Sequence, residues 1–256
     1  MPATTIKEVI ERMDELLARW ETHGDYHAIF VRSYRIITIA MEQAIAAGEF
    51  EDPDWMTRLD IVFAEEYFTA VGAYEQDHER LPECWKRVFD IASRKRSTTL
   101  QDLMLGMVAH IVHDLPIALY KVGVEAEYRE SRLRDHQTAN EILGRSIDDV
   151  QSEISSHYSF ILGFLDRLFG NKDEILTDQG IRIARDLAWK RAVELSEAPT
   201  QAVRDSLLDQ IGQTALTDVK LLTPKPPTLL AKLIPLLRHW DKIIARQIRR
   251  IKSFFS

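Results

Sequence analysis

The chain contains few of the residues that stiffen or interrupt a helix. Its 256 residues include one cysteine, 10 glycines and 9 prolines. The single thiol, Cys84, excludes an internal disulfide and a cysteine-rich zinc site, and it fits a reducing cytoplasm. Few segments alternate apolar and polar residues with the period of a strand. We therefore expect an all-α protein, built as a single multi-helix, bundle-like domain.

The sequence is also expected to lack targeting segments, membrane-spanning segments and the common catalytic motifs. The sequence MPATTIKEVIERMDELL is charged and amphipathic, without the apolar core of a signal peptide. No apolar run is expected to reach the ~20 residues that cross a bilayer. The phosphate-loop, dinucleotide, kinase and serine-hydrolase motifs are not found. These absences predict a cytoplasmic protein that has no serine nucleophile.

Charge divides the chain into an acidic body and a basic tail. The net charge is −7, yet residues 228–256 hold seven Lys or Arg and one acidic residue. The acidic body argues against nucleic acid as a partner. The tail combines an Ile/Leu stripe with a basic face, which allows peripheral contact with a membrane. We favour docking of the stripe on the acidic body, where it would also be able to close one end of a cavity or pair two subunits as a homodimer.

Apolar spacing and capping residues place the helices. We expect helices over about 5–20, 26–47, 53–74, 82–91, 98–122, 128–151, 154–170, 178–196 and 199–217. The run TPKPP is the clearest boundary in the chain. We therefore divide the chain into a helical body (1–222), a Pro-rich linker (223–227) and an amphipathic C-terminal helix (228–256).

The most informative stretch is LMLGMVAHIVHDLPIAL, an apolar helix interrupted by His110, His113 and Asp114. His110 and Asp114 are four residues apart, so both lie on the apolar face of this helix. A buried imidazole and carboxylate at this spacing can bind a metal, form a general-base pair, or simply fix a helix crossing. Pro116 lacks a backbone N–H, so we expect a disturbed helix at this point.

Three further polar residues fall on apolar helical faces. Asp60 lies among apolar neighbours, so its burial would require a cation, a hydrogen-bond donor or a metal. Arg185 shares a face with apolar residues and could neutralise Asp60 or Asp114, clamp an anionic substrate, or form a structural ion pair. Asn140 follows His136 by four residues in a second polar pair. His27 lies among polar neighbours, and we expect it to be exposed.

Four patches occur in an order that resembles a bacterial domain-of-unknown-function family, DUF5995. They are IERMDELLARW with FVRSYRIIT, FEDPDWMTRLDIVFAEEYFTA, GMVAHIVHDLPIAL with DHQTANEIL, and IRIARDLAWKRA, and they span Ile6 to Leu195. Members of the family usually carry Asn two residues before the first motif histidine, where this chain has Val108. The family name implies no reaction, and the tail after TPKPP lies outside the resemblance.

A more distant likeness concerns the same central helix. GMVAHIVHDLP looks like the AHxxGDxxQPLH helix of the zinc-dependent phospholipase C and P1 nuclease group, in which the His and the Asp bind zinc. The likeness implies that His110 and Asp114 are zinc ligands. However, this chain begins MPATT where that group has a ligating Trp, and Leu119 stands near the place of its last motif histidine. A three-zinc site is therefore not expected.

Three functions remain open from the sequence. The first is a metal-assisted, hydrolase-like enzyme in which His110, Asp114 and Asp60 hold one divalent ion, Zn²⁺ or Mn²⁺, and Arg185 stabilises negative charge. The second is a metal-free cyclase or isomerase in which Asp114 orients His110 as acid and base on an apolar small molecule. The third is a helical binding module without catalysis. His113 and Asn140 complete the candidate site.

Overall fold

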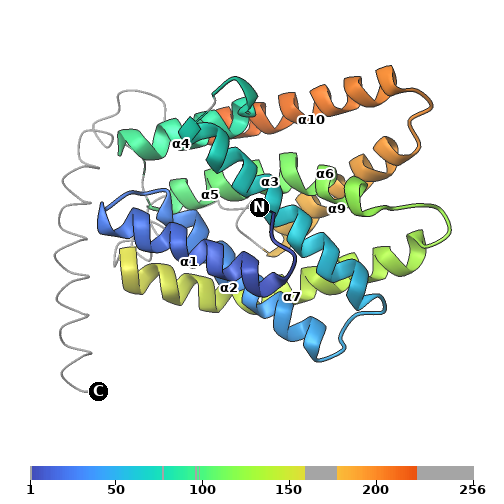
Figure 1. The fold of residues 1–256 in the computed structure, drawn as a ribbon, viewed down its shortest axis with the longest axis horizontal. Coiled ribbons are helices and arrows are strands. Elements are labelled where there is room, and N and C mark those ends of the chain that lie inside the picture. Colours follow the sequence, from blue (N-terminus) through green and yellow to red (C-terminus); the bar gives the residue numbers. More distant parts are fainter. Residues whose placement is uncertain (1, 77, 96, 98, 159–177, 224–256) are drawn as a thin grey trace.

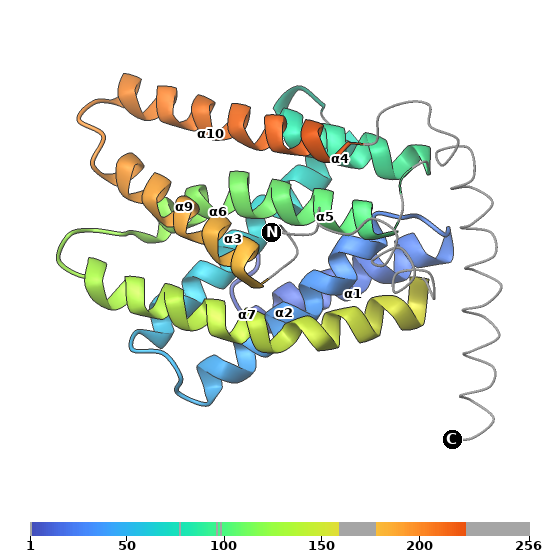
Figure 2. The ribbon, with the colours of Figure 1, turned by 180° about the vertical axis from the view of Figure 1, so that it is seen from behind.

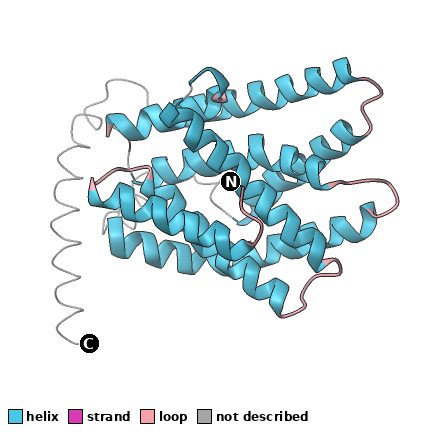
Figure 3. Ribbon diagram, viewed as in Figure 1, coloured by secondary structure: helices cyan, strands magenta, loops and turns pink. Residues whose placement is uncertain are grey.

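The computed structural model describes residues 2–76, 78–95, 97, 99–158 and 178–223 (Figure 1). All regular structure in these ranges is helical, which confirms the expected all-α class (Figure 3). The expected helix 154–170 lies largely outside the described residues, as do the rest of the linker after Thr223 and the amphipathic segment 228–256.

The first two helices pack against each other and begin and end close to where the sequence predicts. Helix α1 (Ile6–Thr22) begins after Thr5, whose hydroxyl accepts a hydrogen bond from the Glu8 N–H over 3.2 Å. A cap of this kind stabilises a helix by ~1 kcal/mol. Helix α2 (Ala28–Ala46) ends just before Gly48, whose φ of 74° a glycine adopts without strain.

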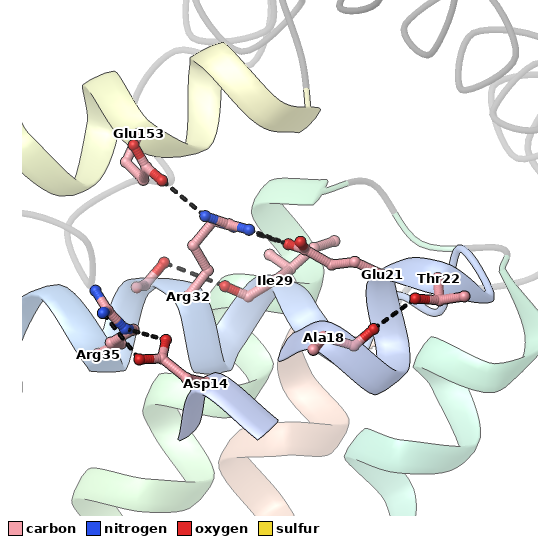
Figure 4. A network of polar contacts seen from close by, with 9 residues as sticks. Asp14, Ala18, Glu21, Thr22, Ile29, Arg32, Arg35 and Glu153 are labelled. Atoms are coloured by element: carbon pink, nitrogen blue, oxygen red, sulfur yellow. Dashed lines mark hydrogen bonds and ion pairs between the residues drawn. The ribbon is translucent and has the colours of Figure 1, made fainter. Parts of the chain in front are cut away.

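Arginines on α2 tie three helices together (Figure 4). Arg32 donates from Nε to Glu21 of α1 over 2.9 Å and from Nη1 to Glu153 of α7 (Arg129–Tyr158) over 2.8 Å. Arg35 donates from Nη2 to Asp14 of α1 over 3.0 Å. Pairs of this kind, partly open to solvent, contribute at most about 1 kcal/mol each. Their main effect is to fix how α1 and α7 lie along α2.

Helix α3 (Pro53–Gln76) begins beside two carboxylates. Asp52 accepts a hydrogen bond from the Trp55 N–H over 2.9 Å. Asp135 of α7 accepts from the N–H groups of Glu51 and Asp52 over 2.7 and 2.8 Å. Unpaired N–H groups at a helix start are stabilised by negative charge, so these bonds anchor the start of α3 on α7.

A central rod is formed by α5 (Thr99–Ala109), η2 (His110–Asp114) and α6 (Leu115–Val122). Neighbouring helices pack around this rod (Figure 2); they are α2, α3, α4 (Glu83–Arg94), α9 (Asp178–Ser196) and α10 (Gln201–Leu222). By length and composition Thr99–Val122 could cross a membrane, which corrects the expectation that no segment reaches that length. However, 67% of its most apolar window is buried, and the core helix of a folded domain passes the same test.

The rod connects two apolar clusters. One cluster includes Ala109 and gathers side chains from α1, α2, α3, α4, α5 and α10. The other includes Leu115 and gathers side chains from α2, α3, α6, α7 and α9. Phe63 of α3 packs against both clusters. The polar residues of η2 therefore lie where the two clusters meet.

Two predicted helix ends are wrong, and one of them is the end of α10, which was expected near 217 and lies at Leu222. We expected a break between 151 and 154, but α7 continues through this stretch to Tyr158. The sequence RSIDDVQSEISSHY contains neither glycine nor proline. Its polar residues therefore mark a change in the helix surface and do not interrupt the backbone hydrogen bonds.

Candidate active site

The candidate site is built on a π turn in the central rod. Within η2 the helix widens, and the N–H of Leu115 donates to the carbonyl of His110, five residues earlier. Pro116 follows at once and has no N–H to offer. The disturbed helix expected from the sequence is therefore present, in the form of a π turn. Such turns are rare and occur often at functional sites.

Asp114 is the centre of the hydrogen-bond network in this turn. One carboxylate oxygen contacts Nδ1 of His110 at 2.8 Å and the other contacts Nδ1 of His113 at 2.6 Å. Nε1 of Trp85, from α4, donates to both oxygens over 3.1 and 2.9 Å. Burial raises the pKa of Asp114, but the bonds from the two histidines outweigh burial and hold its pKa below the usual range. Asp114 is therefore an ionised, fully hydrogen-bonded carboxylate.

The ionised state of Asp114 fixes the tautomer of His110. An ionised carboxylate only accepts hydrogen bonds, so Nδ1 of His110 must carry the proton that joins them. Burial lowers the pKa of His110 more than the Asp114 contact raises it, so the imidazole is neutral at neutral pH. Nε2 then has a lone pair. This atom is buried and has no hydrogen-bond partner among the described residues.

Aromatic rings enclose the imidazole of His110. The ring of Phe63 stacks on it at a centroid distance of 3.6 Å and an angle of 6°. The ring of Tyr34, from α2, meets it edge-on at 4.6 Å. Phe30 and Tyr67 lie at 5.6 and 6.0 Å. These rings exclude water from the imidazole and explain why burial dominates its pKa.

Three further buried polar atoms, on the helices α2 and α3 that pack around this ring, have no partner among the described residues. They are the Tyr34 hydroxyl, Thr38 Oγ1 and Asp60 Oδ2. Thr38 lies one turn beyond Tyr34 on α2, and Asp60 lies one turn before Phe63 on α3. The charges of Asp60 and Asp114 both help burial to raise the pKa of Tyr34. The helices that supply the Tyr34 and Phe63 rings therefore also carry buried polar groups without a described partner.

Asp60 is buried as predicted, but the described chain supplies no cation to it. Burial, and next the negative charge of Glu42, raise the pKa of Asp60 to about 7. Burying an ionised carboxylate without donors is costly, so the group holds its proton up to near neutral pH. The suggested neutralisation of Asp60 by Arg185 is not found.

Arg185 and Asn140 form a second polar cluster between α7 and α9. Arg185 Nε donates to Asn140 Oδ1 over 2.5 Å. Nε2 of His136 contacts the Arg185 carbonyl at 3.1 Å, and Nδ1 of His136 faces Arg185 Nη2 at 3.5 Å. All three side chains are buried. The structure thus brings Arg185 and Asn140 together, and it adds His136, but neither residue bonds to the turn.

Metal ligation has limited support in this arrangement. Within the described ranges, no group of three or more His, Cys, Asp or Glu side chains is arranged to hold an ion. Both oxygens of Asp114 already accept hydrogen bonds. Asp114 would therefore not ligate an ion itself, and would instead orient His110 through the bond to Nδ1. Only His110 Nε2 and Asp60 Oδ2, of the three expected ligands, offer an unpartnered atom.

Sequence reasoning missed Trp85 and Tyr34, and it named His136 only as the partner of Asn140 in a polar pair. Trp85 is 29 residues from Asp114, in an amphipathic helix whose spacing predicts only a core tryptophan. Tyr34 shares the inner face of α2 with other apolar residues, and nothing in that pattern marks its hydroxyl. His136 had a signal in its spacing of four residues from Asn140, the same spacing as His110 and Asp114. Cys84 is buried, as expected for a small core residue.

The fold and the site define a helical protein with a buried His–Asp pair at a π turn. The chain belongs to the family of unknown function DUF5995, which matches residues 6–224. This match confirms the resemblance seen in the motifs, and every candidate site residue lies inside it. No curated protein and no solved structure matches the chain. The likeness to zinc-dependent phospholipase C is not shown.

Proposed function

We propose that this protein is an enzyme that moves a proton on a small, mainly apolar molecule, in the manner of an isomerase or cyclase. The observation that carries the proposal is the Nε2 atom of His110. It is buried, it has a lone pair, and it is unpartnered, while Nδ1 is held by an ionised Asp114. A base in this arrangement is oriented and remains unprotonated at neutral pH.

The proton pathway follows from the tautomer. Nε2 of His110 takes a proton from a carbon or hydroxyl group of the substrate and becomes part of an imidazolium. The carboxylate of Asp114 stabilises that positive charge through the Nδ1 bond. Nε2 then gives a proton, after exchange of the abstracted one with solvent, to a different atom of the same substrate. Atoms and charge balance without a co-reactant, which is the balance of an isomerisation.

In the proposed reaction Asp60 or Tyr34 supplies the acid. With a pKa of about 7, Asp60 is present in both protonated and ionised forms near neutral pH. Tyr34 keeps its proton, since burial raises the pKa of its hydroxyl. Two titratable groups whose environments separate their pKa values can serve as base and acid in one reaction. Asp60 or Tyr34 would donate to the substrate atom on which negative charge develops.

Isotope incorporation tests this function without a known substrate. The purified protein is incubated in D₂O with a protein-free small-molecule extract of the cells that make it, and the extract is followed by mass spectrometry. A proton-moving enzyme exchanges a hydrogen of its substrate for deuterium without changing the rest of the formula. We expect at least one compound to gain deuterium with the wild-type protein and not with His110→Phe.

The control variant is His23→Asn, which changes an exposed histidine directly after the end of α1 and leaves the site alone. It should exchange like the wild type. Circular dichroism checks that His110→Phe is folded, which is expected because a phenyl ring fills the place of the imidazole beside Phe63. An extract that the wild type leaves unlabelled would contradict the proposal and favour a binding module.

A metal-assisted hydrolase is the second candidate, and one observation favours it. His110 Nε2 and Asp60 Oδ2 are buried, unpartnered donor atoms on packed elements, and Asp114 bonds the other nitrogen of His110 as carboxylates behind metal-bound histidines do. A Zn²⁺ or Mn²⁺ ion there would activate water and polarise the scissile bond. Arg185 would offset negative charge on the substrate.

Elemental analysis and labelled water separate the two candidates. The protein is dialysed against Zn²⁺ or Mn²⁺, then against buffer, and its metal content is measured for the wild type, His110→Phe and Asp60→Asn. Stoichiometric metal that is lost in both variants, with uptake of ¹⁸O from labelled water into a product, would replace our proposal by the hydrolase. Deuterium exchange that survives chelation supports the metal-free enzyme.

A further inference from the structure

The second polar cluster holds a positive charge that forms no ion pair with an acidic side chain of the described residues. Arg185 is 6% exposed and lies on the inner face of α9. Its only side-chain partners in the described part of the chain are Asn140 and His136. Burying a charged group without an opposite charge is costly, and buried arginines are usually paired with carboxylates. This guanidinium is instead held by uncharged groups.

His136 is uncharged for a geometric reason. Its Nε2 contacts the backbone carbonyl of Arg185, and a carbonyl only accepts, so Nε2 carries the proton. Nδ1 then presents a lone pair to Arg185 Nη2. Burial, and next the charge of Arg185, hold the pKa of His136 well below its usual range. Asn140 accepts through its amide oxygen, so neither partner reduces the charge of the guanidinium.

The guanidinium itself stays ionised. Burial lowers the pKa of Arg185 to about 10, which still leaves it protonated at neutral pH. The acidic group whose charge raises that pKa is Asp186, the next residue, whose side chain is exposed. Nη1 of Arg185 donates to no partner within the described residues. The arginine is therefore positioned by the bonds of Nε and Nη2, while Nη1 is available to a ligand.

The positive charge of Arg185 also affects the candidate active site. Helix α9 packs on the π turn and on α6. The positive charge of Arg185 contributes to the lowered pKa of His110. Arg185 and His110 therefore belong to one electrostatic environment, although they lie in different polar clusters.

We propose that Arg185, positioned by Asn140 and His136, binds an oxyanion, a carboxylate or a phosphate group, at one end of the substrate whose other end reacts at His110. This inference rests on the proposed function and narrows its substrate to an amphiphilic molecule with an apolar body and one anionic end. A guanidinium donates in parallel to two oxygens of a carboxylate or phosphate, which suits this role better than a single ammonium charge. The indole of Trp189, 5.3 Å from the His136 ring, gives this end an apolar wall.

Matched ligands that differ only in the end group test the inference. Isothermal titration calorimetry compares octanoate, octyl phosphate, neutral octanamide and inorganic phosphate on the full-length wild-type protein. We expect octanoate or octyl phosphate to bind about tenfold or more tightly than octanamide, because a charged hydrogen-bonded pair is lost with the amide. Octanoate and octyl phosphate also distinguish a carboxylate from a phosphate as the natural end group.

Asn140→Asp is the decisive variant. It places a carboxylate where the amide oxygen already accepts from Arg185, so the arginine gains an internal anion and the fold is kept or stabilised. Binding of the anionic ligands should fall to the level of octanamide. Arg185→Lys should weaken the binding of the anionic ligands as well. Lys190→Gln removes an exposed positive charge from the same helix and should leave it unchanged.

Several results would overturn the inference. These are equal binding of octanoate and octanamide, no binding of any of the four ligands, or anion binding that survives Asn140→Asp. Failure of the reaction is distinguishable from failure of the anion site. His110→Phe should lose deuterium exchange and keep octanoate binding, so a protein that binds anions without exchange retains the anion site and loses the proposed chemistry.

Discussion

Two buried aspartates show how neighbours decide the state of a side chain. Asp114 accepts hydrogen bonds from Trp85, His110 and His113, and its pKa lies below the usual range. Asp60 is equally enclosed but has no donor on Oδ2, and its pKa rises to about 7. One carboxylate is thereby a fixed negative charge, and the other is a group that titrates near neutral pH.

The state of Asp60 predicts an unusual pH dependence of stability. Its folded pKa of about 7 lies above the value of 3.8 for a free side chain, so the folded protein binds the proton more tightly than the unfolded chain. The contribution of Asp60 to stability should therefore fall as the pH rises from ~4 to ~7 and then level off, by roughly 4 kcal/mol at most, while the lowered pKa values of His110 and His136 act in the opposite direction below pH ~6.5. Asp60→Asn should remove this fall.

Urea unfolding of the wild type and Asp60→Asn between pH 4.5 and 8 measures the effect. Asp209→Asn, which changes an exposed carboxylate on α10, is the control and should keep the wild-type pH dependence. Identical slopes for the wild type and Asp60→Asn would show that Asp60 is not the titrating group.

At the scale of single residues, the sequence predicts contacts that are local in the chain. The spacing of His110 and Asp114 placed both on one buried face, and the structure confirms this. The spacing could not reveal Trp85, because the contact depends on how α4 crosses the rod. His27 was predicted to be exposed and is buried, since Trp20 and Phe89, from other elements, cover it at 5.4 and 5.3 Å. Its polar neighbours in sequence are not its neighbours in space.

At the scale of elements, the central rod needs a close approach to α2. Gly106 lies one turn before His110, and a Cβ there would come within 2.6 Å of the Phe30 ring. Phe30 in turn packs edge-on against His110 at 5.6 Å. The absence of a side chain at Gly106 is therefore what lets Phe30 reach the site.

We predict that Gly106→Ala lowers the free energy of unfolding and disturbs the site. Overpacking costs ~1–3 kcal/mol, against the ~1 kcal/mol that alanine gains over glycine in a helix. Gly72→Ala in α3 is the matched control, because nothing lies within 4 Å of its Cβ position, and it should be neutral or stabilising. Denaturant unfolding compares the two. Gly106→Ala as stable as Gly72→Ala would contradict the packing argument.

Element boundaries were predictable where a cap or breaker marks them. Thr5 caps α1 as expected, and α10 begins close to Pro199, where we expected it, with the hydroxyl of Thr200 as its cap. The break expected near 151–154 rested on polarity alone and was wrong. Polarity reports which face is exposed, and only a lost or blocked backbone hydrogen bond ends a helix.

At the scale of the whole molecule, the fold class and the family could be predicted from the sequence. Which helices pack together, when they are far apart in the chain, could not. Helix α9 packs on the π turn, although the two are more than sixty residues apart in the chain. Through that packing the charge of Arg185 adds to burial in lowering the pKa of His110. The helical pattern of IRIARDLAWKRA predicts an inward face and gives no information on which helix that face meets.

The C-terminal segment 228–256 stays a prediction of the sequence. We expect its apolar stripe to dock on the body, where Ile183 and Leu187 of α9 are 55% and 58% exposed. The intact chain should then not sediment with anionic vesicles, and a chain ending at Pro227 should lose solubility. Binding to vesicles by the intact chain alone, weakened by salt, would instead assign the tail to a membrane surface.

The most direct test of the account is the protonation state of His110, because the proposed chemistry depends on a neutral ring with a free Nε2. Nitrogen-15 NMR of the histidine-labelled protein, assigned with His110→Phe, reports the proton on each ring nitrogen. At pH 7 we predict a protonated Nδ1 and an unprotonated Nε2 for His110, and loss of this preference in Asp114→Asn. A proton on Nε2 at pH 7, whether in the other tautomer or in an imidazolium, would contradict the account.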